Sequence, residues 1–270
     1  MVSFPPCKIN LGLNVLNKRA DGYHDIETCF YPVPWNDVVE VIRSDSFQFT
    51  STGIPVPGSS NDNLCIRAYQ LLKKDFDLDP VKIHLHKIIP MGAGLGGGSA
   101  DAAHTLLLLN EIFELKLSQD KLQLYASSIG SDCAFFIQEK PMLGSGRGEI
   151  LSPVEVQLDN KFLVIVKPDI HVSTAEAYGG IKPALPDMSL TKIIERPLKE
   201  WKDRLINDFE KTVFVKHPDI KQIKEKLYHA GALYASMSGS GSSVFGIFDK
   251  TVSLQKEFDS CIYWEGVLSI

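Results

Sequence analysis

The stretch "PMGAGLGGGSADAA", residues 90–103, places five glycines directly ahead of an alanine-rich segment with helical character. Each glycine costs roughly 0.5–1 kcal/mol in conformational entropy, so such a run indicates that another group must approach the main chain closely. Backbone N–H groups at the start of a helix attract anions, and the helix dipole adds to this attraction. The stretch therefore predicts a phosphate-binding loop followed by a helix over residues 99–114. A flexible turn without a ligand is the simpler alternative.

Two other phosphate-binding loops can be compared with this segment. A Walker loop needs lysine and then serine or threonine after its final glycine, and here Gly98 is followed by Ser99 and Ala100. A dinucleotide-binding loop needs the pattern GxGxxG, which residues 92–97 satisfy literally. That loop joins the first strand to the first helix of a βαβ unit. Because at least four predicted strands and a helix precede residue 90, the sequence disfavours nicotinamide and flavin binding.

Hydrophobic periodicity outlines the other elements. Apolar and polar residues alternate in "KINLGLNV", residues 8–15, which predicts a strand with one face in the core and a polar face that carries Lys8 and Asn10. Further strands are predicted over residues 26–33, 37–43, 47–52, 81–88 and 162–166. Further helices are predicted over residues 62–75, from Ser118 to near Gly130, and from Pro218 to Gly231. His84 and His86 share one strand face without an evident third ligand, so we interpret them as surface histidines.

The order of these elements predicts an α+β fold with two lobes. Strands and helices alternate unevenly, and the early strands look like antiparallel neighbours, which argues against a doubly wound parallel sheet. The pattern breaks near residues 152–160. We therefore predict an N-terminal domain over residues 1–155 and a C-terminal domain over residues 156–270.

Composition narrows the class of protein. The chain has 270 residues, of which 44% are hydrophobic and 23% charged, as in ordinary globular proteins. The formal net charge of −5 disfavours a general nucleic-acid binder but leaves room for a small anionic ligand. The five cysteines are scattered and form no CxxC pair, which favours reduced thiols in the cytoplasm over disulfides or zinc. The N-terminus has no signal-peptide pattern and no window resembles a membrane span.

Several motifs together resemble the GHMP kinase superfamily, which includes galactokinase, homoserine kinase and mevalonate kinase. The glycine-rich segment is similar to its ATP-binding motif, and "MSGSGSSV", residues 237–244, resembles its C-terminal motif. Three segments point to one branch, whose alcohol substrate carries a cytidine diphosphate group. They are "KINLGLNVLNKRADGYHDIET" at 8–28, "IGSDCAFF" at 129–136 and "GRGEILSPV" at 146–154. The matches run in order through nearly the full chain.

The resemblance implies a two-lobed GHMP kinase fold with the active site in the cleft between the lobes. It also implies phosphoryl transfer from ATP, with Mg2+, to an alcohol of isoprenoid biosynthesis. Magnesium follows from the triphosphate, and no side chain is assigned as its ligand. The residues implied to bind ATP are Pro90, Met91, Gly92, Ala93, Gly94, Leu95, Gly96, Gly97, Gly98, Ser99, Ala100 and, near the adenine, Asn63.

The same resemblance assigns catalytic and substrate-binding roles. Asp132 matches the catalytic aspartate, which would accept the proton of the hydroxyl. Lys8 matches a lysine that would keep this carboxylate ionised and stabilise charge on the reacting oxygens. By themselves, aspartate in "GSD" is usually a turn cap and lysine on a strand's polar face is usually solvated. The residues implied to bind the alcohol and its cytosine are Asn10, Tyr23, His24 and Tyr178.

Two other functions stay open at this point. A GHMP kinase for another small alcohol would share the glycine-rich motif, but Tyr23 and His24 have no evident use with an alcohol that lacks a pyrimidine. A nucleotide sensor without catalytic activity is the alternative from a different class, and the presence of both Lys8 and Asp132 speaks against it. We expect no nucleic-acid or membrane partner, and the sequence leaves the oligomeric state open.

Overall fold

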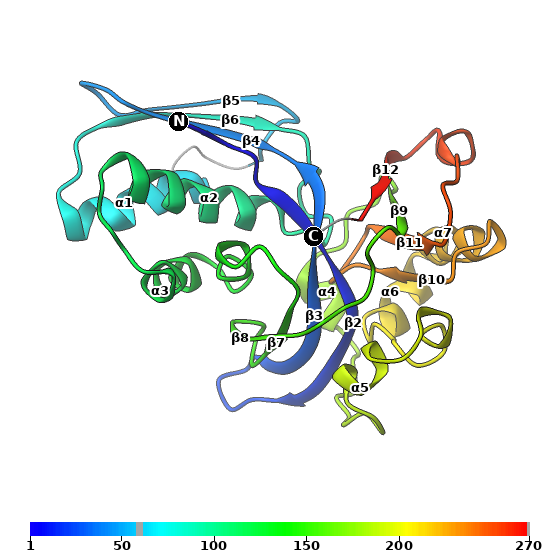
Figure 1. Cartoon of the computed structure of the whole chain (residues 1–270). Coiled ribbons are helices and arrows are strands. Elements are labelled where there is room, and N and C mark those ends of the chain that lie inside the picture. The colour runs from blue at the N-terminus through cyan, green and yellow to red at the C-terminus, as the bar shows by residue number, and fades with distance from the viewer. Residues whose placement is uncertain (58–61, 269–270) are drawn as a thin grey trace. The chain divides into compact units, whose positions relative to one another are not determined.

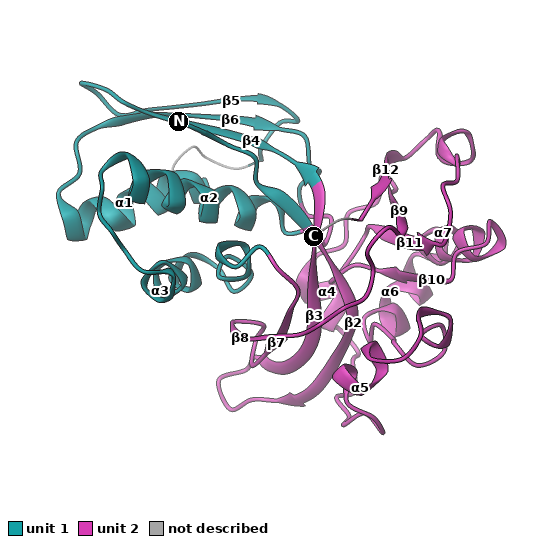
Figure 2. Cartoon of the chain, viewed as in Figure 1, with its two compact units in different colours: residues 1–7, 35–91, 96–139 teal, residues 8–34, 92–95, 140–270 magenta. Residues whose placement is uncertain are grey.

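A computed structural model describes residues 1–57 and 62–268 of the chain. Within these residues the strands form three four-stranded sheets, and the chain divides into two compact units, each built from discontinuous segments (Figure 2). Unit 1 comprises residues 1–7, 35–91 and 96–139, and unit 2 comprises residues 8–34, 92–95 and 140–270. The glycine-rich loop is therefore shared: Gly92–Leu95 belong to unit 2, and the residues on either side belong to unit 1.

Unit 1 contains one sheet with helices packed against it (Figure 1). The strand order is β1-β4-β6-β5, where only the pairing of β5 with β6 is parallel. The strands are β1 (Val2–Ser3), β4 (Val38–Arg43), β5 (Gln48–Gly53) and β6 (Val81–Lys87). The helices are α1 (Leu64–Phe76), α2 (Gly97–Ile112), α3 (Gln119–Ile129) and the short 3-10 helix η2 (Phe135–Ile137). Alternate residues of β6 are buried, as expected for a strand covered by helices on one face.

Unit 2 holds most of the other two sheets. The antiparallel sheet β10-β11-β9-β12 consists of β9 (Phe162–Lys167), β10 (Tyr234–Met237), β11 (Val244–Phe248) and β12 (Ile262–Val267). The sheet β2-β3-β7-β8 consists of β2 (Pro6–Lys18), β3 (His24–Asn36), β7 (Met142–Ser145) and β8 (Ile150–Pro153). The helical segments are α4 (Thr174–Tyr178), α5 (Leu190–Ile194), η3 (Leu198–Glu200), α6 (Glu210–Lys216), α7 (Pro218–His229) and η4 (Gln255–Phe258).

The core of unit 2 joins its sheets to its helices. Leu13 and Val15 of β2 belong to the same buried cluster as the apolar face of α7. Ile220, Ile223 and Leu227 make up that face and recur at helical spacing. Pro218 occupies the first turn of α7, where its missing N–H costs nothing. This packing fixes the early strands of the chain against its C-terminal half.

The structure confirms the α+β class and the predicted strands and helices, with shifts of about one to a few residues at their ends. One expectation was wrong: Lys8 and Asn10 on the presumed polar face of β2 are buried, at 3% and 2% exposure, so both faces of this strand are covered. A second correction is that α2 begins at Gly97 and ends at Ile112, instead of spanning residues 99–114. The domain division at residue 155 stays a prediction. The two compact units are a separate partition of the chain, in which neither unit is a continuous piece of sequence.

Further observations concern the length of the helices, the cysteines and two histidines. Along residues 1–57 and 62–268, no helix is long and apolar enough to cross a membrane. All five cysteines lie within the described residues and none of them forms a disulfide bond; four of them are buried. His84 and His86 lie at the surface of unit 1, where their rings form hydrogen bonds with Thr50 and Thr52 of β5. The interpretation of these two histidines as surface residues is confirmed.

Candidate active site

The second half of the glycine-rich motif forms the start of α2 in unit 1. Gly96 is the N-cap, with φ of 71°, and the first helical hydrogen bond runs from the Ala100 amide to the Gly96 carbonyl at 3.0 Å. Among the described residues no side chain caps this terminus, and its first turn contains no acidic residue. The first N–H groups of a helix have no partner within the helix. The terminus of this 16-residue helix therefore offers backbone donors and a positive dipole end to an anion.

The glycines of the motif serve the protein's own packing as well. A Cβ atom on Gly94, whose φ is 76°, would lie 2.0 Å from the carbonyl oxygen of Ser238. A Cβ atom on Gly97 would lie 2.8 Å from Nζ of Lys87. Within the part of the chain that the structure describes, such an atom on Gly98 would make only ordinary contacts of 3.6 Å or more. The packing of the protein itself therefore requires glycine at residue 94, where the neighbouring atom belongs to the backbone, and a side chain at residue 97 would crowd Lys87 and Ile89. That these glycines also make room for phosphate stays a prediction.

Asp132 lies in the turn that follows α3. Gly130 ends that helix, and the neighbouring Ser131 hydroxyl approaches Oδ1 of Asp132 at 3.4 Å. The next residue, Cys133, is fully buried. Burial raises the pKa of its thiol to about 12, although the nearby side chain of Ser99 acts to lower it. Helix α2 packs against both α3 and η2, which flank the Asp132 turn. Within unit 1, the segment that carries Asp132 therefore lies beside α2.

Asn63 occupies the N-cap of α1 and accepts a hydrogen bond from the Cys65 amide at 2.9 Å. Asn63 therefore acts as the N-cap of α1 in this structure. The next residue, Leu64, has Cδ1 3.9 Å from the site of a Cβ atom on Gly98. The starts of α1 and α2 are thus neighbours, and Asn63 lies at this meeting point. Asn61, which opens the "NDNL" motif, is outside the described residues.

In unit 2, Lys8 is buried in a polar network that anchors the first half of the motif. Its Nζ atom donates to the Gly94 carbonyl at 2.8 Å and to Oδ1 of Asn10 at 2.5 Å. The amide nitrogen of the Asn10 side chain donates to Thr28 at 2.9 Å. Ser238 donates to the same Gly94 carbonyl at 2.9 Å. Lys8 is therefore not a solvated surface lysine, and the "MSGSGSSV" segment packs against Gly92–Leu95 as predicted.

The aromatic residues implied in base recognition also belong to unit 2. The rings of His24 and Tyr178 stack on each other with centroids 4.8 Å apart and an interplanar angle of 17°. The rings of Tyr178 and Phe209 pack edge to face, with centroids 4.7 Å apart. Phe209 therefore supports the position of Tyr178. Tyr23 is 57% exposed and lies under the guanidinium of Arg147 at 5.1 Å. The fold thus brings His24 and Tyr178 together as a stacked pair, and Tyr23 lies next to His24 in the sequence.

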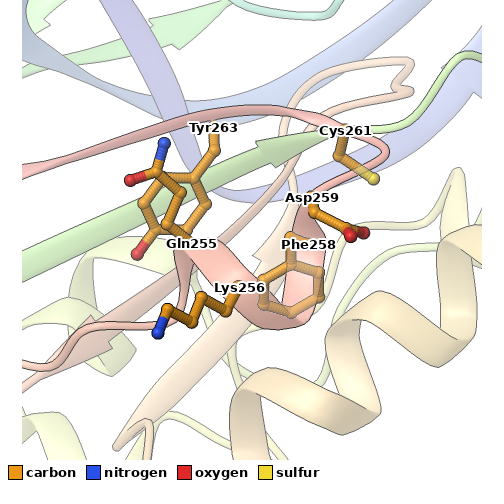
Figure 3. Close-up of a pocket in the computed structure, with 6 residues that line it drawn as sticks. All are labelled: Gln255, Lys256, Phe258, Asp259, Cys261 and Tyr263. Carbon is orange, nitrogen blue, oxygen red and sulfur yellow. The ribbon is translucent and has the colours of Figure 1, made fainter.

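A surface pocket of about 290 Å³ in unit 2 has a different lining from these residues (Figure 3). It lies between η4 and β12, and Tyr263, which forms one wall, hydrogen-bonds to Glu265. None of the predicted site residues contributes to it. Across residues 1–57 and 62–268, no group of three or more His, Cys, Asp or Glu side chains is placed to hold a metal ion.

Sequence analysis missed three buried charged residues of unit 1. Lys87 and Asp101 form an ion pair with an Nζ–Oδ2 distance of 2.9 Å, and Lys87 also pairs with Asp37. A signal for Lys87 was present in the sequence. In β6 it shares the apolar face with Val81, Ile83 and Leu85, where a lysine needs a buried partner.

Comparison with known proteins identifies the family. The model for the N-terminal domain of GHMP kinases matches residues 63–140, and that for their C-terminal domain matches residues 190–259. The chain is 52% identical over its full length to a 4-diphosphocytidyl-2-C-methyl-D-erythritol kinase of Parabacteroides distasonis, all of which is covered. It is 54% identical to an enzyme of that name from Cytophaga hutchinsonii, covering 92% of this chain and 93% of that one.

A solved structure agrees with these relatives. The crystal structure of a 4-(cytidine 5'-diphospho)-2C-methyl-D-erythritol kinase superimposes with a TM-score of 0.85 and 30% sequence identity, covering 98% of each chain. Both glycine motifs of this chain therefore belong to a fold already described for such kinases. The chain belongs to the GHMP kinases and, within them, to the 4-diphosphocytidyl-2-C-methyl-D-erythritol kinase family.

Proposed function

We propose that this protein transfers the γ-phosphoryl group of ATP to the 2-hydroxyl of 4-diphosphocytidyl-2-C-methyl-D-erythritol, in the non-mevalonate route of isoprenoid biosynthesis. The observation that carries the proposal is the 52% identity over the full length of a relative with this name. The open, uncapped start of α2 supports it, because phosphoryl transfer depends on positioned backbone donors around the triphosphate.

Asp132 acts as the base in this proposal. Its carboxylate orients the 2-hydroxyl and accepts its proton while the oxygen attacks the γ-phosphorus and ADP leaves. The packing of α2 against α3 and η2, the elements that flank Asp132, supports this role, since it keeps the Asp132 turn beside α2 of the same unit. Lys8 assists by offering a desolvated positive charge to the reacting oxygens, and its burial supports that assignment.

The proposed nucleotide contacts are the backbone of Pro90–Ala100 for the phosphates and the start of α1, at Asn63, for the adenine. Bound ATP would bring Mg2+, which neutralises charge on the phosphate oxygens during transfer. The residues present fit a metal that reaches the site with the nucleotide, because phosphate oxygens are the ligands that magnesium prefers. The free, mostly buried thiols fit work in the cytoplasm, where ATP is supplied.

Recognition of the cytosine is assigned to Tyr23, His24 and Tyr178, with Asn10 next to the acceptor alcohol. Ring faces attract a base by stacking, and histidine offers a donor and an acceptor to its edge. Because His24 and Tyr178 stack directly on each other, a base enters on an outer face of this pair or after the rings separate. Replacing Tyr178 by alanine should therefore raise KM for the cytidine substrate and leave KM for ATP unchanged.

The test is turnover by the purified protein with ATP, magnesium and 4-diphosphocytidyl-2-C-methyl-D-erythritol, followed as ADP release and as phosphorylated alcohol. Asp132→Asn should lower kcat by about 10²–10⁴-fold. Asp120→Asn, which changes an exposed carboxylate at the start of α3, is the matched control and should keep full activity.

Two outcomes would favour the alternatives. Equal turnover of homoserine or mevalonate would assign the chain to another small alcohol. Tight ATP binding without ADP release on any of these alcohols would identify a nucleotide sensor.

A further inference from the structure

Three charged side chains form a buried cluster in unit 1 that the proposed chemistry does not use. Asp37 lies between β3 and β4, Lys87 is the last residue of β6, and Asp101 lies in α2. Each is at most 2% exposed. The Lys87 ammonium donates to Oδ2 of Asp37 and, at 2.9 Å, to Oδ2 of Asp101. One cation therefore joins two carboxylates that come from different elements.

The cluster fixes the segment that leads into the glycine-rich loop. Oδ1 of Asp37 accepts the backbone N–H groups of Ile88 at 2.5 Å and Ile89 at 2.8 Å. These are the first two residues after β6, directly ahead of Pro90. Charge-assisted hydrogen bonds of this kind are about twice as strong as neutral ones. The direction in which the chain leaves β6 is thus set by Asp37.

The other end of the loop is fixed by the same ammonium. Asp101 is the fifth residue of α2, one turn beyond the N-cap. The backbone of Gly97 lies so close to Lys87 that a Cβ atom there would be 2.8 Å from Nζ and 3.0 Å from Cγ2 of Ile89. The first turn of α2 therefore rests on the Lys87 ammonium and on the segment that Asp37 holds. The cluster joins both places where the loop meets unit 1.

Stability alone is a poor reason for such a cluster. Buried ion pairs are often replaceable by apolar residues without loss of stability. Here two carboxylates share one ammonium, and Oδ1 of Asp101 has no hydrogen-bond partner among the described residues. Burial, with the nearby Asp37 charge, raises the pKa of Asp101 to about 7 despite Lys87. The Asp101 charge in turn helps to raise the pKa of the buried Cys65 thiol on α1, an effect that is secondary to burial.

We propose that Asp37, Lys87 and Asp101 form a positioning cluster, which sets the spacing between the end of β6 and the first turn of α2 and so aims the α2 amides at the triphosphate. The inference rests on the proposed function for its ligand. None of the three side chains is assigned a contact with substrate. They act through the backbone of Ile88, Ile89 and Gly97.

The test uses the full-length protein and equilibrium binding of ATP, measured by calorimetry without any alcohol. Asp101→Leu removes the link from α2 to Lys87 while Asp37 still pairs the ammonium. We expect a Kd for ATP about tenfold higher, in line with the steep dependence of such sites on position. Asp101→Asn keeps an oxygen for Lys87 and should recover most of the affinity. In turnover assays, KM for ATP should rise and KM for the alcohol should not.

The sign of the effect separates positioning from simple charge. Removing a carboxylate near an anion site would tighten ATP binding if only long-range electrostatics mattered. Leu109→Ala is the matched control, because it opens a cavity in the same buried helix face well beyond the loop. It should lower the melting temperature without changing the Kd for ATP.

Three results would overturn the inference. One is unchanged or tighter ATP binding by folded Asp101→Leu, and another is an equal loss of affinity in Leu109→Ala. The third is a wild-type protein that does not bind ATP, which would overturn the proposed function as well. A wild-type protein that binds ATP but does not phosphorylate the alcohol would contradict the proposed function alone, because the binding assay contains no alcohol.

Discussion

At the scale of single residues, Gly94 and Gly98 show how one motif combines different physical requirements. The backbone of Gly94 has φ of 76° and lies against the carbonyl of Ser238. Gly98 lies inside the first turn of α2, where, among the described residues, a Cβ atom would meet Met91 and Leu64 at ordinary contact distances. In the sequence the two glycines look alike. Only the surroundings reveal that the first is required by the fold, and the second is free to serve a ligand.

Alanine substitution should separate these two roles. Gly94→Ala places a methyl group 2.0 Å from a backbone oxygen in a left-handed conformation, so we expect a large loss of stability. Gly98→Ala should instead raise the free energy of unfolding by roughly 0.5–1 kcal/mol, because alanine is the better helix former. Urea unfolding of both variants measures the difference. Equal stability of the two would contradict the contacts described for Gly94.

Lys8 and Asp132 mark how far residue-level prediction reached. Both were identified through motif resemblance, and their ordinary interpretations were a solvated lysine and a turn cap. The burial of Lys8 could not be predicted from the alternation in residues 8–15. Alternation of apolar and polar residues shows that a strand has a polar face, but it does not show whether other parts of the protein cover that face. Lys8 has two hydrogen-bond partners, Asn10, two positions away along the chain, and Gly94, 86 positions away. The contact with Gly94 could be found only from the folded structure.

At the scale of elements, the start of α2 is the feature to which we assign binding of the triphosphate. A helix without a capping side chain or an acidic first turn keeps its positive end available. Filling this end with a fixed negative charge should stabilise the helix and oppose the nucleotide at the same time. That pair of opposite effects is specific to an anion site.

Gly98→Asp tests this directly. The carboxylate should stabilise the nucleotide-free protein by roughly 0.3–1 kcal/mol through the helix dipole. It should raise the Kd for ATP about tenfold or more, because like charges a few ångströms apart repel by at least ~1 kcal/mol even in water. Gly98→Asn, of the same shape but neutral, is the control for steric effects. Similar affinities of the two variants would show that the triphosphate binds elsewhere.

Elements with a strong period were predictable, and short ones were not. The strand over residues 81–88 and the helix from Pro218 to Gly231 carry clear alternation or helical spacing and stop signals. Strands β7 and β8 have four residues each, and helices α4 and α5 have five. Segments this short contain too few residues to define a period. Their structure comes from tertiary packing, as in the cluster that includes Ala177 of α4.

At the scale of the whole molecule, the α+β class was predictable from the sequence, and the domain division at residue 155 stays a prediction. A composition typical of globular proteins and uneven element order indicate an α+β fold. The compact units instead cut β2, β3 and the glycine-rich loop, so that neither is a continuous piece of sequence. A linear scan searches for linkers between continuous domains, and this chain passes between its units several times.

Stability against acid is a property of the whole molecule that one buried group should influence strongly. His104 in α2 is 3% exposed and hydrogen-bonded to Ser3 at 2.6 Å. Burial lowers its pKa from 6.5 to about 4, which outweighs the carboxylate of Glu139, 3.3 Å from Nε2 but largely exposed. Between these two pH values the unfolded chain binds a proton that the folded protein does not. Folding stability is therefore lost as the pH falls from about 6.5 to 4.

Replacing His104 by glutamine should remove this acid sensitivity. When the pH is lowered from about 6.5 to 4, the wild-type protein should lose up to roughly 3 kcal/mol more of its free energy of unfolding than His104→Gln loses. Asp101 acts in the opposite sense, because its raised pKa lowers stability as the pH rises from about 4 to 7, so the difference between variant and wild type is the informative quantity. Urea unfolding at a series of pH values measures it, with the exposed His86→Gln as control for losing a histidine. Parallel curves for His104→Gln and wild type would mean that His104 becomes protonated in the folded protein as readily as in the unfolded chain.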